Sequence, residues 1–162
     1  MTELNEPPGA PRVAIVYGAP TEADAMAQVG AMLRRFGVEY DETVISPHRA
    51  PRALADWAAD LEVRGIEVVV AGGGINAQVA GMVAAHVSLP VIGVPLRGGP
   101  LEGLDALLAM TQMAAGVPVA VVGIGHVLNA AVLAVQMLAV ADPELRVRLA
   151  QFKDEFERLA AQ

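Results

Sequence analysis

The sequence has no cysteine, and it has few aromatic and few charged side chains. Aromatic residues make up 4 % of the 162 residues, and Asp, Glu, Lys and Arg together make up 18 %. Typical soluble domains are roughly 25 % charged. The absence of cysteine excludes disulfides, thiolate nucleophiles and cysteine-ligated metals. With only three scattered histidines besides, the sequence predicts no transition-metal site.

Positive charge is also scarce. The chain has 11 Lys and Arg residues against 18 Asp and Glu residues, which gives a formal net charge of −7. Without a cluster of Lys and Arg we expect neither a nucleic-acid partner nor a basic helix on a membrane surface. Glu3 and Glu6 lie in a first segment with no apolar stretch, which is unlike a secretory signal peptide. A cytoplasmic location is therefore expected.

Apolar residues are abundant, at 54 % of the chain. Two tracts, Val68–Leu96 and Ala106–Ala141, contain no charged residue and exceed the roughly 20 apolar residues of a membrane-spanning helix. Glycine, proline, asparagine, glutamine and histidine divide both tracts into pieces of strand or short-helix length. We therefore predict that they are buried in the core and in the subunit contacts of a homo-oligomer, and not in a membrane.

The apolar pattern predicts an α/β fold. Residues 1–10 are polar and rich in Pro and Gly, so we expect a flexible lead before one domain at 11–162. Strands are expected at 12–17, 38–45, 66–71, 91–94 and 117–124. Helices are expected after Thr21 up to Phe36 and at 51–64, 77–86, 101–110, 129–140 and 143–160. This alternation, with nearly continuous apolar strands, predicts a doubly wound parallel sheet in a three-layer α/β/α sandwich.

Ligands of such sheets bind beyond the carboxyl ends of the strands. Four segments should meet there, namely Gly18–Thr21, Ser46–Arg49, Gly72–Gly74 and Pro95. These segments lie far apart in the sequence. The fold therefore predicts one site built from several loops.

The first of these loops precedes a helix. Free N–H groups at such a position suit an anion, and Thr21 could both cap the helix and bind a phosphate. Glu22 could accept hydrogen bonds from ribose hydroxyls. An ordinary strand-to-helix turn, with Thr21 as a cap and Glu22 placed favourably for the helix dipole, explains the same residues.

The second and third loops carry more specific residue types. Arg49 offers a planar fork for phosphate, His48 can exchange a proton near neutral pH, and Ser46 adds a hydroxyl. A solvated loop that starts the next helix is the alternative. Gly72–Gly74 would let the backbone approach a ligand closely, or would form only a flexible turn. The spacing fits neither a dinucleotide fingerprint nor a Walker A loop.

Several motifs in this order resemble the N5-carboxyaminoimidazole ribonucleotide mutase family of purine biosynthesis. The similarity covers about residues 11–158. The motifs are RVAIVYGAPTEADAM, VISPHRAPRAL, VVVAGGGINAQVAGMVAA, LPVIGVPL, the run from Leu101 to Gly116, and LNAAVLAVQMLA.

The resemblance implies a flavodoxin-like fold, a homo-octamer, and a reaction without metal, biotin or ATP. Carboxylate would move from N5 to C4 of aminoimidazole ribonucleotide through carbon dioxide. His48 would protonate N5 and later help to remove the C4 proton. Arg49, Ser46 and Thr21 would hold the 5′-phosphate, and Glu22 would bind the ribose.

The resemblance also assigns substrate contacts to Gly18, Ala19, Gln78 and the Gly72–Gly74 loop, which would enclose carbon dioxide and the imidazole. Several positions depart from the family pattern, three of them among these site residues. Ala19 lacks a hydroxyl, Glu22 replaces an aspartate, and Gln78 stands where the family has histidine. These departures leave open a paralogue acting on a different nucleotide-like substrate, a carboxylase using free carbon dioxide, and a non-catalytic nucleotide-binding oligomer.

Overall fold

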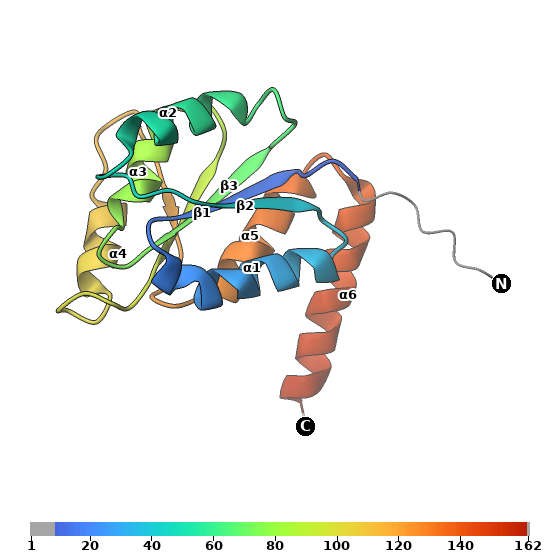
Figure 1. The fold of residues 1–162 in the computed structure, drawn as a ribbon. Helices are drawn as coiled ribbons and strands as arrows, with labels where there is room; N and C mark the ends of the chain where they lie inside the picture. Colours follow the sequence, from blue (N-terminus) through green and yellow to red (C-terminus); the bar gives the residue numbers. More distant parts are fainter. Residues whose placement is uncertain (1–8, 162) are drawn as a thin grey trace.

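The structure is a computed structural model that describes residues 9–161, and Figure 1 shows its fold. The elements are β1 (Val13–Tyr17), the 3₁₀ turn η1 (Pro20–Glu22), α1 (Ala23–Arg35), β2 (Tyr40–Val44), α2 (Pro51–Asp60), β3 (Val68–Gly73), α3 (Gln78–Ala84), β4 (Val91–Pro95), α4 (Leu104–Thr111), β5 (Ala120–Val121), α5 (Val127–Leu138) and α6 (Pro143–Ala160). Most of the predicted flexible lead lies outside the described residues. Of that lead, only Gly9 and Ala10 are described, and both are exposed.

The strands form one parallel sheet with the order β2-β1-β3-β4-β5. β1 lies between β2 and β3, so that Val13 pairs with Tyr40 on one side and with Val68 on the other. This is the flavodoxin-like order of a doubly wound sheet. The predicted α/β sandwich is confirmed.

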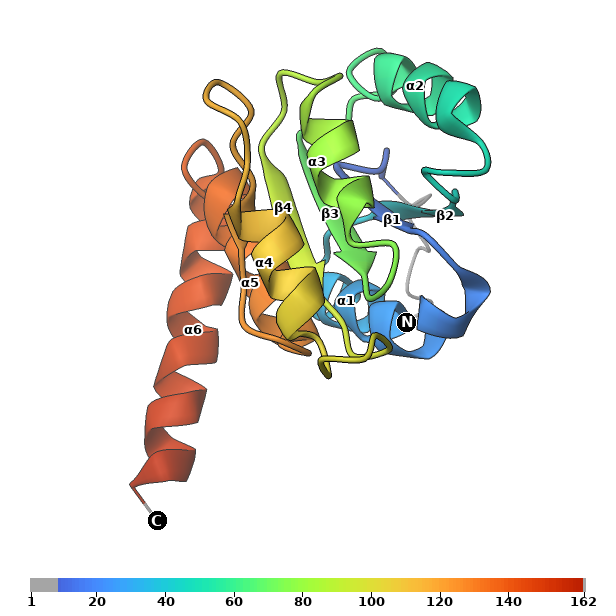
Figure 2. The ribbon, with the colours of Figure 1, turned by 90° about the vertical axis from the view of Figure 1, so that its left-hand side faces the viewer.

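Helices cover both faces of the sheet (Figures 1 and 2). Along β1 the side chains alternate between two apolar clusters, as the period of a strand requires. Val13, Ile15 and Tyr17 pack with α1, α5 and the start of α6. Ala14 and Val16 pack with α2, α3 and α4. The buried β1 therefore holds both halves of the core together.

Some predicted boundaries are wrong, for local reasons. The strand expected at 117–124 is paired with β4 only at Ala120 and Val121. The helix expected from residue 101 begins at Leu104, because Glu102 and Gly103 have φ angles of 51° and 95°, outside the right-handed helical region. The helix expected at 129 starts two residues earlier, at Val127.

Gly72 and Gly73, expected in a ligand loop, are strand residues of β3 and pair with Val94 and Pro95. Gly72 has a packing role, because a Cβ there would overlap the thioether of Met26 from α1. Only Gly74 of the three glycines lies beyond the strand. No helix within residues 9–161 is long and apolar enough to span a bilayer.

Candidate active site at the carboxyl edge of the sheet

The predicted site residues gather along the carboxyl edge of the sheet. β1 connects to β2 on one side, whereas β3 and β4 continue the sheet on the other. The loops after β1 and β3 therefore flank the point where the strand order reverses, which is the usual ligand-binding crevice of this fold.

Glu22 joins these two loops. Its side chain is buried, with the residue 8 % exposed, in the turn before α1. One carboxylate oxygen, Oε2, accepts hydrogen bonds from the backbone N–H groups of Gly18 (2.9 Å) and Ala19 (3.0 Å). The other, Oε1, accepts one from the N–H of Gly74 at 2.7 Å. Across residues 9–161, Glu22 is the one charged residue that is buried.

The amides expected to bind an anion are thus already paired with a carboxylate of the protein. Bonds from N–H groups to a charged acceptor are stronger than neutral ones, so this contact fixes the two loops relative to each other. A carboxylate has about four acceptor positions, of which three are filled here. The remaining acceptor capacity of Glu22 is compatible with the predicted ribose contact, which stays a prediction.

Thr21 does not cap α1, contrary to the sequence-based expectation. It lies inside the η1 turn, where the residue flanking α1 is Glu22 and no side chain caps that helix. Thr21 is exposed. Its hydroxyl is therefore not committed to the helix end and lies beside the cavity described next.

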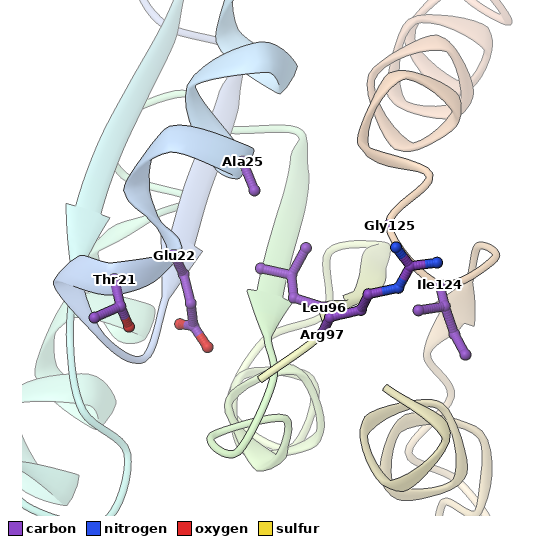
Figure 3. A pocket seen from close by; sticks show the side chains of 7 residues that line it. All are labelled: Thr21, Glu22, Ala25, Leu96, Arg97, Ile124 and Gly125. Atoms are coloured by element: carbon purple, nitrogen blue, oxygen red, sulfur yellow. The ribbon is translucent and has the colours of Figure 1, made fainter. Parts of the chain in front are cut away.

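A cavity of about 410 Å³ opens between the loops after β1, β4 and β5 (Figure 3). This volume is within the range of small-molecule sites. Glu22 and Arg97 contribute its charged groups, and Figure 3 shows them on different sides, with Arg97 reaching towards Gly125. The lining residues are Thr21, Glu22, Ala25, Leu96, Arg97, Ile124 and Gly125.

Arg97 was not among the residues predicted from the sequence. It is the first charged residue after the uncharged tract Val68–Leu96, and it closely follows a predicted strand that ends at the carboxyl edge. Those two signals together could have identified it. The segment after β4 therefore adds a positively charged side chain to the loops that were expected at the site.

The Ser46–Arg49 loop follows β2 at the same edge but does not line this cavity. The N–H of Ala50 donates to the carbonyl of Ser46 at 3.0 Å and closes a turn. Within that turn Pro47 is buried, whereas His48 and Arg49 are exposed. Within the part of the chain that the structure describes, neither of these two side chains has a hydrogen-bond partner, so both remain available to a ligand.

The segment after Gly74 packs on the first loop. A Cβ at Gly18 would overlap the side chain of Asn76, so the two loops are in close contact at this glycine. Gln78 is the first residue of α3 and is exposed. Asn76 was another residue that the sequence did not single out.

Tyr17 secures the end of β1 to β2. Its side chain is buried, and the hydroxyl donates to Oε1 of Glu42 at 2.7 Å. Burial, and then the hydrogen bond to Glu42, raise the pKa of Tyr17 to about 12. The phenol therefore stays protonated at ordinary pH and positions the two strands that carry the Gly18 and Ser46 loops. Among the described residues, no group of three or more His, Asp or Glu side chains could hold a metal ion.

The AIR carboxylase family model matches residues 12–158. The chain belongs to the AIR carboxylase family. It is 46 % identical over 151 residues to an N5-carboxyaminoimidazole ribonucleotide mutase of Mycobacterium tuberculosis (strain ATCC 25618 / H37Rv), covering 93 % of this chain and 87 % of the relative. The mutase of Thermotoga maritima is 41 % identical over 148 residues, with 91 % and 86 % covered.

Two further relatives of this family member bear on fold and function. A phosphoribosylaminoimidazole carboxylase of Saccharomyces cerevisiae is 42 % identical over 142 residues, which are 88 % of this chain but 25 % of the yeast protein. The crystal structure of Treponema denticola PurE superposes with a TM-score of 0.85 at 20 % identity, covering 93 % and 94 % of the two chains. That structural similarity shows the fold.

Proposed function

We propose that this family member is an N5-carboxyaminoimidazole ribonucleotide mutase of purine biosynthesis. The observation that carries the proposal is the 46 % identity to the mycobacterial mutase over 93 % of this chain and 87 % of the relative. The substrate class fits a site with an exposed His–Arg pair after β2 and a cavity open at the same edge of the sheet.

The proposed chemistry uses the imidazole of His48 twice. The bond between N5 and the carboxylate carbon breaks, the electron pair stays on N5, and the His48 imidazolium supplies the proton that N5 gains. The released carbon dioxide is then attacked by C4, and a C–C bond forms. Neutral His48 takes the proton that C4 loses. The imidazolium is restored, so the reaction is a balanced isomerisation that consumes no proton.

Substrate binding is assigned to the surrounding loops. Arg49 and Ser46 hold the 5′-phosphate with the exposed hydroxyl of Thr21, and Glu22 offers its remaining acceptor capacity to a ribose hydroxyl. Gly18 and Ala19 act through the backbone that Glu22 fixes. Of the Gly72–Gly74 segment, Gly74 lies beyond β3 and closes over the imidazole, and the exposed Gln78 lies next along this loop.

The test is turnover of the purified protein with N5-carboxyaminoimidazole ribonucleotide, with the C4-carboxylated product separated by chromatography. We expect product formation above the uncatalysed background. His48→Ala should lower the turnover rate by at least about a hundredfold, in line with the usual contribution of a general acid–base residue. His86→Ala is the matched control, because His86 is also exposed but lies beyond α3, away from the carboxyl edge. No turnover by the wild-type protein would refute the proposed function.

A carboxylase that uses free carbon dioxide is the second candidate, favoured by the yeast relative that carries the name phosphoribosylaminoimidazole carboxylase. Product formation from aminoimidazole ribonucleotide and carbon dioxide, with none from the N5-carboxylated compound, would select it. A paralogue with another nucleotide-like substrate is favoured by Ala19, which offers no hydroxyl. Binding of the ribonucleotide without turnover would instead indicate a nucleotide-binding oligomer.

The proposal includes a homo-oligomer in the cytoplasm, an octamer by resemblance to the family. α6 packs on α5 through Leu145 and Leu149, and its far half projects from the body of the protein (Figure 2). Apolar side chains are exposed along α6 and just before it in the single chain, namely Val140, Val147, Phe156 and Leu159. Sizing of a dilute sample should give a mass well above the 16.8 kDa of one chain, and a monomer would contradict this part. Cell fractionation tests the location.

A further inference from the structure

The side chain of Arg97 has no hydrogen-bond or ion-pair partner among residues 9–161 and faces the cavity at the carboxyl edge. Across residues 9–161, most other arginines are engaged, as Arg12 is by Glu67 and Asp142 and Arg64 is by Asp41. Arg97 has no such hydrogen bond or ion pair and lines the cavity of about 410 Å³. An arginine presents five N–H donors in a planar fork that matches a carboxylate or a phosphate.

The backbone holds Arg97 at this place. The N–H of Leu96, the residue before it, donates to the carbonyl of Gly73 at 3.0 Å and so continues the pairing of β4 with β3. The carbonyls of Leu96 and Arg97 lie 3.3 Å and 3.2 Å from where a Cβ at Gly74 would stand. Gly74 is also the residue whose N–H binds Glu22. The loop that carries Arg97 thus packs directly on the bridge between the first and third loops.

The surroundings of Arg97 favour an anion. Ala25, Leu96 and Ile124 line the same cavity with apolar groups, and Arg97 itself is exposed. Glu22, opposite, already binds three backbone N–H groups, and no contact joins it to Arg97 in the described part of the chain. The exposed guanidinium is therefore the group in this cavity that is free to bind an anion from outside the protein.

We propose that Arg97 binds the carboxylate of the ribonucleotide substrate and so selects for carboxylated ligands. The inference rests on the proposed function, in which the ligand has anions at two ends. Arg49 follows β2 and Arg97 follows β4, which lies three positions away in the sheet. At about 4.8 Å between neighbouring strands, the ends of these two strands are about 14 Å apart. With the phosphate at Arg49 and the carboxylate at Arg97, an extended ligand would lie along the carboxyl edge of the sheet between the two arginines.

The test compares two ribonucleotides that differ only in the carboxylate. The affinities of aminoimidazole ribonucleotide and of its C4-carboxylated form are measured by calorimetry for wild type, Arg97→Gln and Arg97→Lys. Arg97→Gln should bind the carboxylated form at least about tenfold more weakly, because a hydrogen bond to a charged group is lost. It should bind the uncarboxylated form within about threefold of wild type. Arg97→Lys should fall between, because lysine keeps the charge but lacks the fork.

Arg158→Gln is the matched control, since Arg158 lies near the end of α6, far from the carboxyl edge (Figure 2). Equal weakening of both ribonucleotides by Arg97→Gln would overturn the proposal and assign Arg97 to the phosphate. Unchanged binding of both would overturn it as well. If wild type turns the substrate over but Arg97→Gln binds it normally, only this inference fails. If wild type binds neither ribonucleotide, the proposed function fails with it.

Discussion

Replacing Glu22 by glutamine tests whether its carboxylate holds the first and third loops together. Glutamine has nearly the same shape, but only one of its two terminal atoms accepts hydrogen bonds. If its carbonyl oxygen keeps the bonds from Gly18 and Ala19, its NH₂ group faces the buried N–H of Gly74. Two donors then meet, and one buried N–H group is left unpaired.

The expected loss follows from these contacts. An unpaired buried donor costs about 1–3 kcal/mol, and the two remaining bonds weaken because their acceptor is no longer charged. The smaller desolvation cost of a neutral amide offsets part of this loss. Glu22→Gln should therefore lower the free energy of unfolding by about 2 kcal/mol.

Urea unfolding followed by circular dichroism, at one fixed protein concentration, measures this difference. Glu157→Gln serves as the control, because it makes the same chemical change on the exposed surface of α6 and should alter stability by less than about 0.5 kcal/mol. Glu22→Asp keeps the charge but shortens the reach, and should also be destabilised. A Glu22→Gln protein as stable as the control would refute the bridging role.

Two further predictions concern the packing below the site. Since the folded protein raises the pKa of Tyr17 from 10.0 to about 12, the unfolded chain ionises first as the pH rises. The contribution of this phenol to stability is complete below pH 10 and should be lost between about pH 10 and 12. The urea midpoint of Tyr17→Phe should therefore fall less over that range than the wild-type midpoint. An equal fall in both proteins would contradict this. Gly72→Ala should lower the thermal midpoint, because the added methyl group overlaps Met26 at a cost of about 1–3 kcal/mol. In a Met26→Ala background, Gly72→Ala should be less harmful. Additive losses of the two substitutions would contradict the overlap.

The sequence predicted the fold well because the strands and helices are decided by local patterns. β1 reads VAIVY and is buried at every position, as a central parallel strand requires. Gly37 was expected to end the first helix, and its φ of 68° is the left-handed conformation of that position. β5 was overestimated, because an apolar run does not reveal how many residues a neighbouring strand pairs with.

The candidate site was less predictable, because its geometry depends on contacts between distant residues. Glu22 next to a helix start gave no sign that its carboxylate would reach Gly74, 52 residues further along. Gly72 and Gly73 looked like loop residues because glycine is common in turns, but here β3 continues through them. Arg97 belongs to no motif; its position after the strand expected at 91–94 indicates the carboxyl edge, but only the folded sheet places it beside Thr21 and Glu22 at the cavity.

The Glu22 bridge also has a consequence for the motions of the molecule. Its three donors are the amides of Gly18, Ala19 and Gly74, so neither loop can open without releasing the same carboxylate. In native-state hydrogen exchange these amides should therefore exchange as one cooperative unit, with similar protection, although they belong to two separate loops. Local opening at the point of strand reversal is then an event shared by both loops that flank the ligand-binding crevice.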